Sequence, residues 1–175
     1  MKMNSYASPL CFKLIYVVFF LLSCKEKDKP RIPYGDIGDI YFNPNIDDHS
    51  FKVCNEHLSI QFNYHRIGLI YEGEKTALIE HFKKNYNHKI EKGQSGYITI
   101  RFVINCEGKP GRFRISEMDF DLTEKKISSR IKEKLLTTTK NAPGWVIYTH
   151  KGKPYDYYQY LVFKIQNGQI EEILP

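Results

Sequence analysis

Few residues in this sequence have the types and the spacing that chemistry requires. Cys54 is followed three residues later by His57, and a thiolate and an imidazole at this spacing could bind zinc. Zinc would need two more ligands, of which Cys106 offers one. Ser95 lacks the glycine spacing and the following helix of a nucleophile elbow. Residues 107–111 lack the Lys-Ser/Thr pair that ends a phosphate-binding loop. We therefore expect a protein with no catalytic residues and no cofactor.

The N-terminal segment has the features of a bacterial lipoprotein signal. Lys2 and Lys13 precede nine apolar residues, 14–22, whereas a helix needs about 20 residues to cross a bilayer core. The residues Leu21-Leu22-Ser23-Cys24 resemble the lipobox, which implies cleavage before Cys24 and a diacylglycerol thioether on its sulfur. We expect residues 1–23 to be a signal peptide and the acyl chains on Cys24 to anchor the protein in a membrane. A soluble secreted protein with a chance cysteine is the alternative.

The expected compartment indicates the chemical state of the other cysteines. Cys11 leaves with the signal peptide, so Cys54 and Cys106 remain as a pair. An isolated pair in an oxidising compartment is typical of a disulfide. The bridge would close a loop of about 50 residues and stabilise the fold by about 4 kcal/mol on the chain-entropy model. We expect this disulfide and no metal, with the zinc site as the alternative.

Composition and charge describe a globular protein of the cell envelope. The chain has 175 residues, of which 42% are hydrophobic and 26% charged, and this excludes a multi-span membrane protein, a coiled coil and a disordered chain. The formal net charge is +6, but two of the positive charges lie in the signal peptide. Outside the cytoplasm we expect membrane lipid, envelope polymer or an outer-membrane protein as partners, and no nucleic acid.

Residues 24–50 are expected to be the lipidated cysteine followed by an extended tether and arm. Residues 25–31 alternate charges, contain no apolar residue besides Pro30 and cannot pack against a core. They resemble the charged stretch that sends some Bacteroidetes lipoproteins to the cell surface, and a plain spacer is the alternative. The resemblance implies an outer-membrane lipoprotein, facing either the periplasm or the surface. Ile40-Tyr41-Phe42 is the one short apolar contact of the arm.

Residues 51–175 have the patterns of a folded domain. Apolar residues alternate with polar ones in the strand-like segments, while Leu78, Phe82 and Tyr86 recur at helical spacing. We expect, in order, a strand over 58–65, a helix over 74–86, a hairpin of 96–105 and 112–116, a helix over 122–138, and a hairpin of 145–149 and 155–165. This order predicts an α+β fold, an antiparallel sheet with two helices packed on one face.

The strands, turns and helices between residues 76 and 169 also form a recognisable series. Its members are the strand 96–105, the turn Glu107-Gly108, the strand from Phe113, the charged helix, Trp145, Gly152-Lys153-Pro154 and the strand 161–165. This series resembles the TonB C-terminal domain. The family pairs an exposed edge strand with an extended segment of an outer-membrane receptor. The resemblance implies that residues 155–165 form this edge, with the binding residues Tyr155, Tyr157, Tyr158, Tyr160 and Lys164.

The chain departs from TonB itself at its N-terminal end. TonB has a transmembrane helix and a long proline-rich spacer, whereas this chain has a cleavable lipoprotein signal. It is more similar to small TonB-like lipoproteins of Bacteroidetes. We expect a non-catalytic interaction domain that binds a protein segment or an envelope polymer by its sheet edge or its open face. The alternatives are a structural subunit of an outer-membrane assembly and an enzyme whose site the sequence does not reveal.

Overall fold

The computed structural model describes residues 40–55, 60–61 and 68–174. The expected signal peptide, Cys24 and the tether up to residue 39 lie outside the described residues, and so does most of the strand expected over 58–65. Neither helix in the described part is long and apolar enough to cross a membrane.

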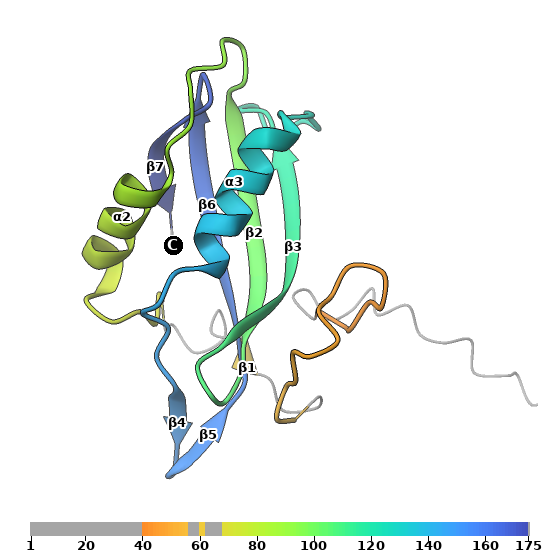
Figure 1. Cartoon of the computed structure of the whole chain (residues 1–175), viewed down its shortest axis with the longest axis vertical. Helices are drawn as coiled ribbons and strands as arrows, with labels where there is room; N and C mark the ends of the chain where they lie inside the picture. Colours follow the sequence, from red (N-terminus) through yellow and green to blue (C-terminus); the bar gives the residue numbers. More distant parts are fainter. Residues whose placement is uncertain (1–39, 56–59, 62–67, 175) are drawn as a thin grey trace, which may run out of the picture. The chain divides into compact units, whose positions relative to one another are not determined.

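The sheet is mixed but mostly antiparallel (Figure 1). Its strands are β1 (Ile60–Gln61), β2 (Gly96–Ile104), β3 (Pro110–Met118), β6 (Tyr157–Gln166) and β7 (Gln169–Leu174). They lie in the order β1-β6-β2-β3, and β7 also pairs with β6. β6 is antiparallel to both β2 and β7, while β1 runs parallel to it. β4 (Tyr148–His150) and β5 (Lys153–Tyr155) form a separate two-stranded sheet.

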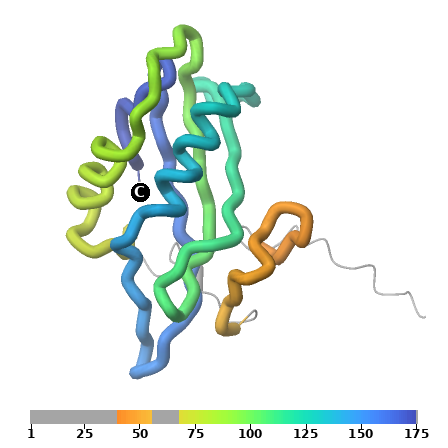
Figure 2. The backbone as a smooth tube through the Cα atoms, in the orientation of Figure 1, coloured from red at the N-terminus to blue at the C-terminus, as the bar shows by residue number. Residues whose placement is uncertain are grey.

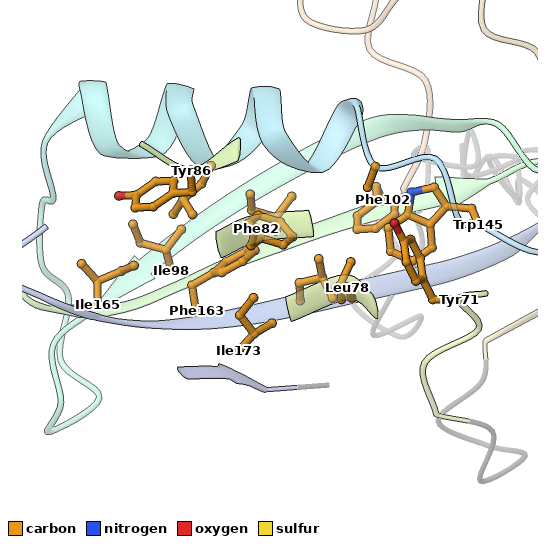
Figure 3. Close-up of a cluster of buried hydrophobic side chains, with 14 of the residues drawn as sticks. Tyr71, Leu78, Phe82, Tyr86, Ile98, Phe102, Trp145, Phe163, Ile165 and Ile173 are labelled. Atoms are coloured by element: carbon orange, nitrogen blue, oxygen red, sulfur yellow. The ribbon is translucent and has the colours of Figure 1, made fainter. Parts of the chain in front are cut away.

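Two helices, α2 (Glu74–Asn85) and α3 (Ser129–Lys140), supply the second layer. Leu78 and Phe82 from α2 and Ile131 and Leu135 from α3 are buried at helical spacing. They pack on the same sheet face, because the core also contains alternate residues of β2 and β6, namely Ile98, Ile100, Phe102, Ile104, Leu161, Phe163 and Ile165 (Figure 3). The predicted α+β class, an antiparallel sheet with two helices on one face, is confirmed.

The second helix begins later than predicted, at Ser129 rather than near residue 122. Leu122 has a positive φ of 68°, which a helix cannot include. The Asp121 carboxylate accepts hydrogen bonds from the backbone and hydroxyl of Thr123, at 3.0 and 2.6 Å, and so closes a local turn. The Glu117 carboxylate accepts the backbone N–H of Ile127 at 2.7 Å. These side chains hold the segment before the helix in a non-helical conformation.

The prediction that residues 155–165 form a sheet edge is wrong. β6 pairs with β2 along one side, and with β7 and β1 along the other. The chain reverses after β6 because Asn167 and Gly168 both adopt positive φ, at 49° and 79°, as a two-residue hairpin turn requires. The residues after this turn, Gln169–Leu174, form the strand β7, so that β6 lies inside the sheet.

The arm is held to β3 by a pair of charge-assisted hydrogen bonds. Arg114 donates to the two carboxylate oxygens of Asp47, each at 2.7 Å, and to the Tyr41 carbonyl at 2.8 Å. The Asp47 side chain is only 2% exposed, and Ile40 nearby in the sequence is also buried. The arm between Ile40 and Asp47 thus packs on the domain through a buried apolar residue, an ion pair with a buried carboxylate and the contact of Arg112 with the Phe42 ring.

We expect Asp47→Asn to lower the free energy of unfolding by about 1–2 kcal/mol near neutral pH, because it removes the charge from these hydrogen bonds. The hydrogen bond from Arg114 holds the pKa of Asp47 below its ordinary value of 3.8. The stabilisation is therefore complete above that value and lost as the pH falls through the lowered folded-state pKa. Urea unfolding of both proteins at a series of pH values checks this, with Glu133→Gln as an exposed control. A difference that persists at low pH would contradict it.

Candidate functional site

In the described part of the chain, β7 and the two-residue β1 lie at one edge of the sheet and β3 lies at the other. β7 pairs with β6 alone among the described residues, so the backbone groups on its other side have no strand partner there. α2 lies beside this edge (Figures 1 and 2). An edge strand of this kind is a template on which a further strand can pair.

A groove of about 530 Å³ separates α2 from β7. Its apolar lining comes from both elements and consists of Ile79, Phe82, Tyr86, Ile170 and Ile173. Two lysines of the helix, Lys75 and Lys83, and two glutamates of the strand, Glu171 and Glu172, also line it. The groove thus combines apolar and charged residues of a helix and a strand beside an open strand edge. We call it the β7 groove.

The local sequence explains how α2 and β7, the two sides of the groove, are placed. Ile79 and Lys83 are one turn apart on α2. They lie next to Phe82 and Tyr86, whose side chains are buried in the core. The Tyr86 hydroxyl donates a hydrogen bond to the Gly168 carbonyl at 2.8 Å. This bond ties the end of α2 to the β6–β7 turn. Burial raises the pKa of Tyr86 well above its ordinary range, so the hydroxyl remains protonated and continues to donate.

The charged residues that line the groove differ in their partners. Glu171 pairs with Lys164 of β6 at 3.1 Å, and this hydrogen bond raises the pKa of Lys164. Within the described residues neither Lys75 nor Lys83 forms a salt bridge. As far as the described residues show, the helix side of the groove carries two positive charges without a salt-bridge partner, which favour a ligand with acidic side chains on that side.

The residues expected at the binding edge do not come together. Tyr157 is fully buried and its hydroxyl donates to the Val146 carbonyl at 2.8 Å. Tyr155 belongs to β5, where it pairs with Tyr148. Tyr158, Tyr160 and Lys164 alternate with the buried residues of β6 and lie on the sheet face opposite the helices. The sequence signal for the true edge was Asn167-Gly168, a strong hairpin dipeptide followed by Ile170 and Ile173.

Cys54 and Cys106 form a disulfide, with their Cα atoms 6.0 Å apart. It joins the segment after the arm to the turn between β2 and β3. His57, which belongs to the alternative zinc site, lies outside the described residues. Comparison of the chain with protein-family models, with curated proteins and with solved structures gives no match.

Proposed function

We propose that this protein is a lipid-anchored component of the cell envelope whose TonB C-terminal-like domain binds an extended protein segment, without catalysis. The segment adds as a strand to β7 and lies in the β7 groove. The acyl chains on Cys24 hold the domain at the outer membrane, and residues 25–39 separate it from the lipid. The resemblance of the sequence to the TonB C-terminal domain supports the mode of binding.

The observation that carries this proposal is that an open strand edge lies beside a groove lined partly by apolar side chains. In strand addition the main-chain hydrogen bonds supply affinity, and the alternate side chains that enter a groove supply specificity. β7 has six residues, Gln169–Leu174, and so accommodates a segment of similar length. Its exposed residues Glu171 and Glu172 disfavour pairing between two copies of the same acidic edge. The preferred segment alternates apolar residues and carries an acidic one toward Lys75 and Lys83.

A specific observation also favours the opposite sheet face as a second binding surface. Tyr97 and Phe120 lie edge to face with centroids 5.3 Å apart, and the Lys164 ammonium lies 5.9 Å from the Phe120 ring. Rings beside a cation suit an envelope polymer with apolar and anionic groups. This surface is the alternative to the β7 groove.

Selection from a library of displayed peptides tests the main proposal. The bait is residues 25–175, the expected mature chain without its lipid, which contains the whole hydrophobic core between Tyr71 and Ile173. We expect peptides with alternating apolar residues, and we expect a proline at the centre of such a peptide to abolish binding because it removes a main-chain donor. Hydrogen exchange of the β7 amides should slow in the complex.

Two variants with the same chemical change locate the site. Ile79→Asp places a charge in the apolar part of the groove lining and should lower the affinity for the selected peptide by about 10-fold or more. Ile90→Asp alters a side chain that is 70% exposed and does not line the groove, so its affinity should be that of the unaltered protein. Melting temperatures confirm that both variants are folded. Strand addition at β7 would be contradicted by peptides that still bind with a proline at their centre, or that bind both variants with equal affinity.

A further inference from the structure

Asp156, between β5 and β6, is a buried carboxylate at the disulfide. The residue is 2% exposed. One oxygen accepts the backbone N–H of Asn55 at 2.7 Å, and the other accepts the backbone N–H of Cys106 at 2.9 Å. The carboxylate therefore bridges the two chain segments that the disulfide also joins, because Asn55 directly follows Cys54.

No cation among the described residues pairs with this carboxylate. The salt bridges there involve other acids, and the hydrogen bonds to Asp156 come from uncharged backbone groups. Burial of an ionised carboxylate is unfavourable unless charge or hydrogen bonds compensate it. Two N–H groups use only part of its capacity, since each oxygen has a further lone pair. Asp156 thus keeps acceptor capacity for a cation.

The two sulfur atoms lie close to this carboxylate. The Sγ atoms of Cys54 and Cys106 and a carboxylate oxygen of Asp156 all lie within 4.8 Å of one another. Two thiolates and a carboxylate are ligands that zinc accepts, at about 2.3 Å for sulfur and about 2.0 Å for oxygen. Cys54 is exposed and Cys106 half-buried, which leaves room for water as a fourth ligand.

We propose that the reduced form of this protein binds a thiophilic divalent metal ion such as Zn²⁺ through Cys54, Cys106 and Asp156. The metal-bound form and the disulfide exclude one another, because both use the same two sulfur atoms. A dithiol reductant transfers two electrons and two protons to the disulfide and becomes a disulfide itself. The metal ion then displaces the two thiol protons into solvent. This inference does not depend on the proposed binding of a protein segment.

The geometry favours metal binding because one ligand is already in place. In the disulfide form the hydrogen bonds from Asn55 and Cys106 hold the Asp156 carboxylate beside the sulfur atoms, and neither bond involves a sulfur atom. They also join the two cysteine-bearing segments independently of the disulfide. A site whose carboxylate is oriented by such bonds loses less freedom when the metal binds.

Cobalt titration of residues 25–175 tests the proposal. This chain contains Cys54 and Cys106 as its only cysteines. It is reduced with a water-soluble phosphine, desalted without oxygen and titrated with Co²⁺. We expect thiolate-to-cobalt absorption that saturates at one ion per chain and disappears on addition of Zn²⁺. The oxidised chain should bind none, and Zn²⁺ should raise the melting temperature of the reduced chain alone.

Two aspartate variants test whether Asp156 is a metal ligand or only contributes negative charge to the protein. Asp156→Asn should weaken cobalt binding by about 10-fold or more, on the scale of losses at oriented metal sites. Asp121→Asn, at an exposed carboxylate in a turn, should bind as tightly as the unaltered chain. If Asp156→Asn does not fold, Cys106→Ser takes its place, with the same expected loss. The proposal is overturned if the reduced chain binds no cobalt, if both aspartate variants bind equally, or if the reduced chain stays unfolded with Zn²⁺ present.

Discussion

Replacement of Phe82 by alanine is expected to lower the free energy of unfolding by about 3–5 kcal/mol. Phe82 is 1% exposed, and its ring centroid lies 4.9 Å from that of Phe163 (Figure 3). It connects α2 to the centre of the sheet, where Ile98 and Leu161 belong to the same core. The substitution removes buried apolar surface and leaves a cavity between a helix and a sheet that can collapse only in part.

Urea unfolding followed by circular dichroism measures this loss. Lys84→Ala is the matched control, because Lys84 is an exposed residue of the same helix and its truncation should change stability by no more than about 0.5 kcal/mol. A loss below about 1 kcal/mol for Phe82→Ala would show that α2 does not pack on the sheet as described.

Loss of the disulfide is expected to cost about 4 kcal/mol. Cys54 and Cys106 are 52 residues apart in the sequence, and a bridge over such a loop restricts the unfolded chain strongly. The bridge also ties the segment after the arm to the β2–β3 turn, next to the hydrogen bonds of Asp156. We therefore expect the double variant Cys54→Ser, Cys106→Ser to unfold at a lower urea concentration than the oxidised protein.

The measurement compares the oxidised protein, the phosphine-reduced protein and the double serine variant, all with a metal chelator present. The reduced protein and the serine variant should have the same midpoint, and the reductant should not change the variant. Equal midpoints for the oxidised and reduced proteins would contradict a stabilising bridge. The chelator keeps this result independent of the metal site proposed above.

Much of the fold could be predicted because its periodicities are local. The alternation of Ile98, Ile100, Phe102 and Ile104 predicted a strand with one buried face, and all of these side chains are buried in β2. The helix expected over 74–86 is α2, Glu74–Asn85, because its apolar stripe repeats every fourth residue. Such patterns show which side chains share one face of a helix or strand, and residues close together in the sequence are enough to reveal this.

The last strand was missed because its pattern is interrupted. Ile170 and Ile173 are three residues apart, which does not fit the two-residue period of a strand, and Glu171-Glu172 between them looks like a solvated tail. The structure accounts for the spacing by an irregularity in the β6–β7 pairing, where the register shifts between Lys164 and Ile165. Side-chain period alone could not reveal a strand that contains such a shift.

The sequence by itself determined the α+β class, the places of most strands and helices, and the cysteines available for a bridge. Only the tertiary structure decided that β7 rather than β6 forms the edge, because an edge is defined by the strands that do not pair. It also brought Asp156 to the two sulfur atoms, about 50 residues or more from each partner that donates to it. Periodicity is a local property of a chain, whereas strand neighbours and buried charge contacts depend on how distant segments pack together.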